Sequence, residues 1–390
     1  MRREIVRLCA LLLALFWLVG PALAAPLEAE PPVALTSPSA MLVEAGTGTV
    51  IFEKNADERR QAASVTKLMT LLICFEELEA GNLHLDDSVT VSQEAAAQIG
   101  SQALLDAGAV YSLEDLLHAT IVASANDAAC ALAEHIAGTE AAFAELMNAR
   151  AAELGMNNTY YTNATGLPDD AQYTTARDVA TLSVEMCRHP GYFKHASVWM
   201  DTLTHPSGRV TDLTNTNRLV RFYEGCDGLK TGSADASRYC LSATAQKDGL
   251  RFIAIVLGAE TSQKRFDEAR AMLDYGFANY ALVSTEMPEP LQPVPVTLGQ
   301  KAAVQPELQQ AAPILIEKGL QAAVTRTVTL AERVEAPVAA GQQLGTLTIS
   351  ANGETLAEIP IIAPEAIERL TWWELTCRLL RRLCMTMPEE

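Results

Sequence analysis

One apolar helical run constrains this chain most, because it requires a buried core around it. From Leu68 to Leu78, apolar side chains recur at the spacing of one helix face, and Ala80-Gly81 ends the run. This periodicity predicts a core helix that begins near Ser64-Val65-Thr66-Lys67. Positions three apart share a helix face, so we expect the Lys67 amine to reach the Ser64 hydroxyl. A serine beside a basic amine is a candidate nucleophile with its base.

The Ser64–Lys67 pattern is weak evidence by itself. Ser-x-x-Lys arises by chance in many chains, and serine often caps the first free amides of a helix. Two further patterns follow in the chain. Ser124-x-Asn126 comes after the apolar run 113–122, and Lys230-Thr231-Gly232 leads into sequence with the alternation of antiparallel strands. The three patterns together contain the groups that acyl transfer to a serine requires.

The composition indicates a folded, acidic protein. The 390 residues are enough for two or three domains, and 49% hydrophobic with 20% charged residues is typical of globular chains. A formal net charge of −19 argues against nucleic acid as a partner. The eight cysteines and six histidines show no close metal-ligand spacing, so we expect no metal or other cofactor. Most cysteines are interpreted as small buried hydrophobes, and a Cys226–Cys240 disulfide is left open.

The first residues have the features of an export signal. Arg2, Arg3 and Arg7 precede the apolar run Leu8 to Val19, and Ala22-Leu23-Ala24 offers a small-residue cleavage site. This arrangement predicts a secretory signal peptide over residues 1–24. An uncleaved anchor is the alternative, but the run is short for a membrane span. We therefore expect an exported protein.

Four further segments follow the signal peptide. Residues 25–38 are rich in Pro, Ala and Glu and predict a linker. Residues 39–285 show two early strands, helices in the middle, three late strands and a closing helix, which predicts an α+β domain. Residues 286–363 begin with closely spaced prolines and continue with short β-like segments, which predict a small β-sandwich. Residues 364–390 form the tail.

The tail, residues 364–390, predicts an amphipathic helix. At helical spacing, tryptophan, leucine and cysteine side chains share one wide face, while Arg378, Arg381 and Arg382 lie on the remaining arc. Together with Arg369, these cations disfavour a transmembrane span and suit a helix that lies in the membrane interface. A helix that packs on the protein or on a partner is the alternative. We expect this segment to hold the protein at the outer face of the cytoplasmic membrane.

The three motifs in this order are an established signature of penicillin-binding proteins and class A β-lactamases. The chain resembles the low-molecular-mass penicillin-binding proteins that are serine-type D-alanyl-D-alanine carboxypeptidases. The likeness extends to residues 42–55, 63–70, 124–138, 154–166, 173–180, 215–219 and 227–232, and to the β-rich domain and basic tail. The resemblance implies a penicillin-binding-protein/β-lactamase-like catalytic domain. It also implies a peptidoglycan stem peptide ending in D-Ala-D-Ala as substrate, and acylation by β-lactam antibiotics.

The chemistry assigns a candidate role to each motif residue. Ser64 is the nucleophile, and Lys67 is the base, since burial and a nearby cation would lower its pKa. Ser124 and Lys230 can relay a proton to the departing amine. Asn126 can hold the peptide amide of the substrate. The terminal D-alanine ends in a carboxylate, which the enzyme must bind. The Thr231 hydroxyl and the Lys230 cation beside the strand are suited to bind it.

The resemblance supplies the remaining site residues. By family position, the backbone amides of Ser64 and Ser233 form the oxyanion hole, and Gly232 belongs to the same substrate-binding strand. Arg265 stands where the family often keeps an arginine that binds the substrate carboxylate. A structural role on a helix face is an equally open interpretation of Arg265.

Two positions depart from the family pattern. The family usually continues Lys-Thr-Gly with a threonine and, further on, an Ala-Gly pair, whereas this chain has Ala234 and Ser237-Arg238. Arg238 stands where the family usually has glycine. This difference is expected to alter the shape of the loop beside the oxyanion strand, and thereby the turnover rate or the substrate preference.

Three other functions compete with the carboxypeptidase. A class A β-lactamase would need a glutamate that activates the deacylating water, for which Glu153 in Glu153-Leu154-Gly155-Met156-Asn157 is the candidate. A zinc peptidase would need a His-Glu-x-x-His or similar pairing, which the sequence lacks. From a different class, a non-catalytic wall-binding or regulatory relative could retain the same fold.

Overall fold

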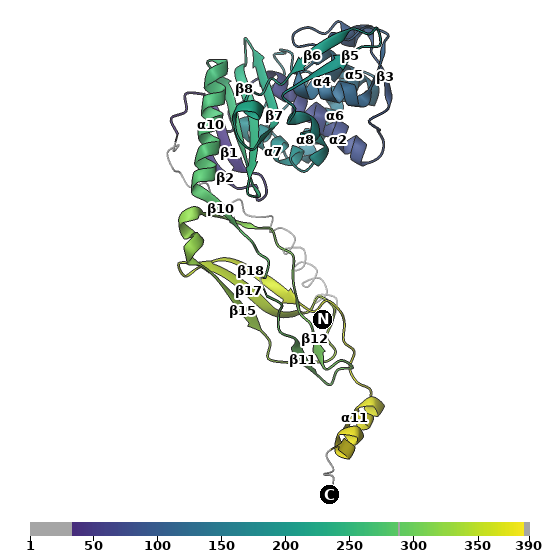
Figure 1. Cartoon of the computed structure of the whole chain (residues 1–390), viewed down its shortest axis with the longest axis vertical. Coiled ribbons are helices and arrows are strands. Elements are labelled where there is room, and N and C mark those ends of the chain that lie inside the picture. The colour runs from purple at the N-terminus through teal and green to yellow at the C-terminus, as the bar shows by residue number, and fades with distance from the viewer. Residues whose placement is uncertain (1–32, 288, 386–390) are drawn as a thin grey trace, which may run out of the picture. The chain divides into compact units, whose positions relative to one another are not determined.

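The computed structural model describes residues 33–287 and 289–385, and of residues 381–385 the backbone only (Figure 1). The chain divides into two compact units between Phe277 and Ala278. The predicted signal peptide and residues 25–32 of the predicted linker lie outside the described residues.

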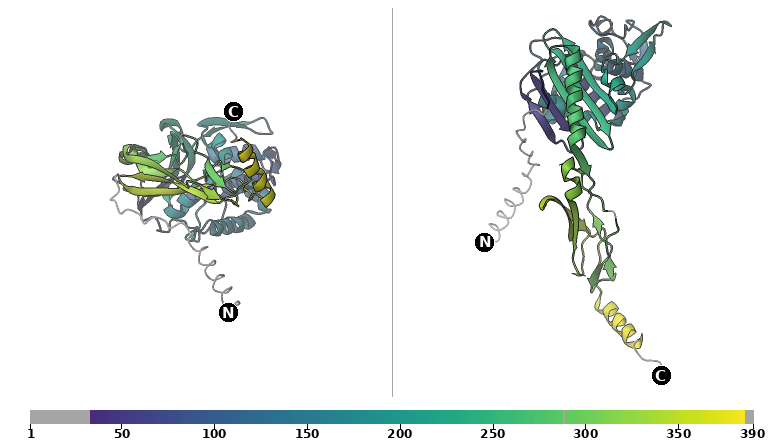
Figure 2. Two further views of the ribbon diagram at one scale, coloured as in Figure 1. Left: turned by 90° about the horizontal axis from the view of Figure 1, so that it is seen from below. Right: turned by 60° about the vertical axis from the view of Figure 1, so that its left-hand side comes forward.

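A five-stranded antiparallel sheet forms one side of the first unit, in the order β2-β1-β9-β8-β7. Its strands are β1 (Ser39–Glu44), β2 (Val50–Lys54), β7 (Cys226–Ala234), β8 (Arg238–Lys247) and β9 (Leu250–Ala259). The long helix α10 (Ser262–Asn279) lies along one face of this sheet, and the helical region covers the other (Figure 2). Coverage of both faces explains why β9 is buried along almost its whole length, without the alternation of a half-exposed strand.

The core helix predicted from the apolar run is confirmed as α2 (Lys67–Glu79), and its first nine residues are buried. The helix differs from the prediction at its start, where Ala63–Thr66 form a separate 3₁₀ turn, η1. Around α2 pack α4 (Leu113–Val122), α5 (Asn126–Ala137), α6 (Glu140–Glu153), α7 (Ala176–Met186) and α8 (Pro190–Ala196). Smaller elements complete the unit: α3 (Gln93–Ala96), α9 (Leu219–Phe222), and the strand pairs β3 (Ser88–Thr90) with β4 (Val110–Ser112) and β5 (Met200–Thr204) with β6 (Val210–Thr214).

The second unit is built from short strands, as its sequence predicts. Three sheets form it: β10 (Tyr280–Val283) with β14 (Ile314–Glu317); β12 (Ala303–Val304), β11 (Val294–Thr297) and β16 (Val334–Glu335); and β13 (Glu307–Leu308), β18 (Glu354–Ile362), β17 (Gln343–Ala351) and β15 (Val324–Leu330). A 3₁₀ helix, η2 (Lys318–Ala323), precedes β15. Alternating residues of β17 and β18, such as Leu347 and Ile359, form one apolar cluster. Val294, Val338 and Ile367 belong to the other.

The second unit ends in the helix α11 (Trp372–Met385). Trp372 and Trp373 are 86% and 76% exposed, so the unit does not cover the tryptophans of the apolar face. On the polar face, Arg378 donates hydrogen bonds to the carbonyls of Gly299 (3.1 Å) and Gln300 (3.0 Å). Within the described residues, no helix combines the length and apolar character that crossing a membrane would require.

The disulfide left open by the sequence does not form. Cys226 and Cys240 are free, as are the other four cysteines whose side chains the structure describes. Cys226 is paired across the sheet with Ala245 and Cys240 with Gly232, which places the two thiols near opposite ends of β7. Burial raises the pKa of Cys226 to about 12 and that of Cys240 to about 11, so both are inert thiols.

Candidate active site

The turn that carries Ser64 is held between two backbone segments. A Cβ atom on Gly232 of β7 would lie 2.2 Å from the Ala62 carbonyl oxygen and 3.1 Å from the Ser64 nitrogen. A Cβ atom on Gly166 would lie 2.0 Å from the Ala63 carbonyl oxygen, and the Gly166 φ of +79° also favours glycine. Only glycine fits at either position. Ser64 is therefore positioned by main chain on both sides.

Lys67 lies beside Ser64 on the first turn of α2. Its Nζ is 3.1 Å from the Ser64 Oγ and donates to the Thr165 carbonyl oxygen (2.6 Å) and to the Asn126 side-chain oxygen. The side chain is fully buried. Burial lowers the pKa of Lys67 to about 7, although the carboxylates of Glu140 and Asp127 oppose the shift. A lysine with this pKa can be neutral near physiological pH and accept a proton.

A second lysine–serine pair lies in the same region. Ser124 occupies the loop between α4 and α5 with a positive φ of 60°. The Lys230 Nζ donates to the Ser124 Oγ (2.7 Å) and to the Thr231 carbonyl oxygen (3.1 Å). Burial, together with the nearby cations Lys67 and Arg265, lowers the pKa of Lys230 well below its usual value. Lys230 is therefore also able to give up and take back a proton.

Asn126 links this second pair to Lys67. Its side-chain oxygen accepts from Lys67, its amide nitrogen donates to the Ile99 carbonyl (2.5 Å), and its backbone nitrogen donates to the Ser101 carbonyl (2.7 Å). The neighbouring Asp127 is fully buried and accepts hydrogen bonds from backbone amides of the same loop, residues 97–105. These bonds keep one wall of the site in place.

Strand β7 brings the third motif to this site. The Thr231 hydroxyl donates to the Thr216 hydroxyl (2.7 Å), and Ser233 follows Gly232 with its side chain exposed. Arg265, on α10, is buried and donates to the carbonyls of Gly232 (2.9 Å) and Cys240 (3.2 Å). Burial lowers its pKa to about 10. The guanidinium thus lies against the backbone of β7 and β8, and the role of Arg265 in carboxylate binding stays a prediction.

Sequence reasoning did not single out several residues that support the site. The Thr165 carbonyl accepts from Lys67, and Thr216 accepts from Thr231. The Glu140 carboxylate accepts from the Ala164 amide (3.0 Å), and burial raises its pKa. The only sequence signal for these residues was their place in or near the family-like stretches: Thr165 lies in 154–166, Thr216 lies in 215–219, and Glu140 follows 124–138.

Two positions discussed from the sequence are resolved by geometry. Arg238 has a φ of +54°, a conformation that glycine adopts without strain and other residues adopt at a cost of about 1 kcal/mol. Arg238 therefore occupies a position whose backbone conformation favours glycine. Glu153 ends α6, where its carboxylate is 66% exposed and paired with Arg150 (3.0 Å). Among the described residues, the ion pair of Glu153 is with Arg150 and not with a residue of the Ser64 site.

The fold and the arrangement of these groups define the class of a serine acyl-transfer enzyme, with two buried lysines in place of a His-Asp pair. The model of the D-alanyl-D-alanine carboxypeptidase family matches residues 25–261, and that of the penicillin-binding protein 5 C-terminal domain matches residues 286–369. The chain belongs to the D-alanyl-D-alanine carboxypeptidase family. The expected family and fold class are thereby confirmed.

Curated relatives and solved structures agree with this membership. The chain is 36% identical to the D-alanyl-D-alanine carboxypeptidase DacF of Bacillus subtilis over 85% of its own length and 86% of the relative's. It is 32% identical to DacC of Escherichia coli, over 84% and 83% of the two chains. Its structure is similar to penicillin-binding protein 5 from Haemophilus influenzae, with a TM-score of 0.73, 30% identity and coverage of 87% and 100%.

Proposed function

We propose that this chain removes the terminal D-alanine from peptidoglycan stem pentapeptides through an acyl-enzyme on Ser64. We also propose that β-lactam antibiotics acylate the same serine. The observation that carries the proposal is the pairing of Ser64 with a buried lysine 3.1 Å away whose pKa is lowered to about 7. Membership of the carboxypeptidase family supports the choice of substrate.

In the proposed acylation, neutral Lys67 takes the Ser64 proton as the Oγ attacks the carbonyl carbon of the penultimate D-alanine. The amides of Ser64 and Ser233 stabilise the oxyanion. The Ser124–Lys230 pair, joined at 2.7 Å, relays the proton from Lys67 to the departing amine as the C–N bond breaks, which leaves Lys67 neutral again. A water molecule then hydrolyses the Ser64 ester and releases the shortened peptide.

The remaining residues orient the substrate in this proposal. Asn126 binds the peptide amide, while Thr231 and Lys230 bind the terminal carboxylate with Arg265 beside them. Arg265 already donates to the Gly232 carbonyl, so its cation lies within reach of the strand that the substrate would follow. A carboxylate there is favoured by both positive charges.

We expect labelled penicillin to form a stable adduct on Ser64, because the drug's strained amide enters the same acylation step. Mass spectrometry of the intact protein, followed by peptide mapping, would locate the adduct. D-alanine release from a stem pentapeptide is measured on the same sample. Absence of any adduct in a folded sample would favour the non-catalytic relative. Rapid drug turnover with little D-alanine release would favour the β-lactamase.

We further propose that the protein is exported and held at the outer face of the cytoplasmic membrane by α11. The exposed side chains of Trp372 and Trp373 and the arginines of the tail support this proposal. Tryptophan is favoured at the interface between lipid and water, and arginines are attracted to anionic lipid headgroups.

Deletion of residues 371–390 is expected to abolish most binding to vesicles that contain anionic lipid, because it removes both the apolar face and three of the four tail arginines. Co-sedimentation with vesicles at two salt concentrations would measure the effect. The truncated protein should retain D-alanine release from a soluble pentapeptide, which serves as the control for folding. Equal vesicle binding by the full and truncated chains would overturn this proposal.

A further inference from the structure

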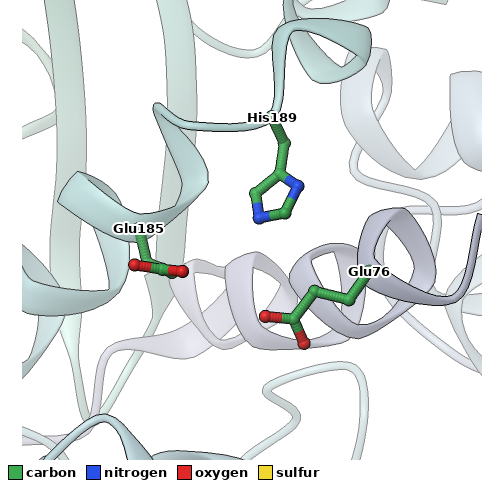
Figure 3. A group of neighbouring side chains, drawn as sticks. All are labelled: Glu76, Glu185 and His189. Atoms are coloured by element: carbon green, nitrogen blue, oxygen red, sulfur yellow. The ribbon is translucent and has the colours of Figure 1, made fainter. Parts of the chain in front are cut away.

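A cluster of possible ligands lies outside the serine site, between the C-terminal half of α2, α7 and the start of α8. Glu76, Glu185 and His189 each place a ligand atom within 4.8 Å of the other two (Figure 3). We propose that these three side chains bind one divalent transition-metal ion of the zinc type. The ion would join three helical elements and stabilise the helical region.

His189 provides the strongest evidence. The residue is only 7% exposed, and its buried Nε2 has no hydrogen-bond partner among the described residues. Figure 3 shows a ring nitrogen directed toward the space between the two carboxylates. A buried imidazole nitrogen without a partner is unfavourable, and a metal ion between the carboxylates would satisfy it.

The other nitrogen of His189 has a carboxylate beside it. Its Nδ1 is 3.0 Å from a Glu79 oxygen, close enough for an ion pair, but the angles do not meet those of a hydrogen bond. Metal-binding histidines usually present their second nitrogen to a carboxylate, which fixes the tautomer and the ring orientation. Glu79 therefore lies where the carboxylate beside a metal-binding histidine usually lies. The other nitrogen, Nε2, is then the atom that would bind the metal ion.

The net charge around the cluster is negative and favours the binding of a cation. Arg150 lies 2.6 Å from Glu76 and 3.6 Å from Glu185, and Arg188 lies 2.7 Å from Glu185. The two guanidiniums pair with the carboxylates of Glu76, Glu153 and Glu185, while Glu79 lies beside His189. Four carboxylates and two guanidiniums leave two negative charges in excess around the cluster. A carboxylate has about four lone-pair sites, so a glutamate can bind an arginine and a metal ion at once.

The donor set indicates which ion would bind. One imidazole and two carboxylates suit Zn²⁺ or a neighbouring first-row ion, whereas Mg²⁺ and Ca²⁺ prefer oxygen ligands only. Zinc–ligand bonds of about 2.0–2.2 Å bring ligand atoms closer than 4.8 Å, so the glutamates would rotate slightly inward. With three protein ligands, a water molecule would complete a tetrahedral site.

The test uses the full chain after treatment with a chelator. Calorimetric titration with Zn²⁺ should show one equivalent bound, and zinc at about 100 times its Kd should raise the Tm by on the order of 5 to 10 °C. His189→Gln should weaken zinc binding about 100-fold or more and remove the Tm shift. Glu153→Gln is the matched control: it removes one negative charge and a partner of Arg150 but no ligand atom, so its zinc affinity should stay within a few-fold of the wild type. Mg²⁺ should give no shift.

Two further measurements keep the test decisive. A Co²⁺ titration should give visible bands of a nitrogen–oxygen site without thiolate charge transfer, which excludes binding by the free cysteines. If His189→Gln does not fold by circular dichroism, Glu185→Gln carries the same expected loss of binding. No saturable zinc binding by the wild type would overturn the proposal, as would unchanged binding in a folded ligand variant.

Discussion

Ser64→Ala is expected to abolish D-alanine release, lowering kcat by about 10⁴-fold or more, as loss of a covalent nucleophile does in serine peptidases. The hydroxyl oxygen is the atom that forms the ester, and among the described residues Ser64 is the serine whose hydroxyl is hydrogen-bonded to Lys67, at 3.1 Å. The measurement is D-alanine released from a stem pentapeptide by wild type and variant. The same substitution should remove the penicillin adduct.

Ser112→Ala is a suitable control for the Ser64 experiment. Ser112 caps α4 by accepting a hydrogen bond from the Asp115 amide (3.0 Å), so its loss should cost about 1 kcal/mol of stability. Ser112 has no part in the proposed chemistry, and its variant should keep the wild-type kcat. If a folded Ser64→Ala protein still released D-alanine, the proposal that the acyl-enzyme forms on Ser64 would be wrong.

Acylation by penicillin should become faster as the pH rises toward 7 and then level off. Below the pKa of Lys67, which is about 7, each unit of acidification should reduce the rate about tenfold, because only the neutral amine can take the Ser64 proton. From the plateau above the pKa down to pH 5 the rate should therefore fall about 100-fold, and from pH 7, where half of the lysine is neutral, about 50-fold. Stopped-flow or quenched measurement of adduct formation over pH 5–9 checks this.

The same lowered pKa affects folding in a predictable direction. A lysine whose pKa is lower in the folded chain binds its proton more readily when unfolded, so acidification from its ordinary value of 10.5 toward 7 reduces stability. Lys230, whose pKa is also lowered, adds to this effect. Circular dichroism at each pH separates loss of fold from loss of base. A flat rate profile from pH 5 to 9 in folded protein would contradict the assignment of Lys67 as the base.

Much of the fold followed from local patterns in the sequence. The apolar spacing after Lys67 gave the core helix, and the alternation and turn residues late in the first unit gave β7, β8 and β9. What the patterns could not show is the 3₁₀ turn at Ala63–Thr66, because packing against Gly166 and Gly232 decides its shape. Sequence spacing does not reveal contacts between segments that lie 100 or more residues apart, as Gly166 and Gly232 do from Ser64.

The motif side chains were found by residue type, but their partners were not. The atom of Thr165 that binds Lys67 is a backbone carbonyl, which every residue has, so no residue type could point to it. Likewise, Glu76, Glu185 and His189 are spread along the chain without a ligand spacing, and only the packing of α2, α7 and α8 brings them together. Isolated histidines in a sequence therefore did not suggest a metal site.

The close contacts of Gly166 and Gly232 with the Ser64 turn limit which residues of this enzyme can change during evolution without displacing the nucleophile. Since main-chain atoms fix the turn, exchange of neighbouring side chains leaves the nucleophile's position almost unaltered, whereas any residue larger than glycine at 166 or 232 displaces it. Variants that differ in antibiotic sensitivity or peptide preference should therefore accumulate changes in exposed side chains around the site and not in the turn that carries Ser64. The exposed side chains of Ile99 and Leu104, on the loop that Asn126 and Asp127 hold, are the first places to look for them.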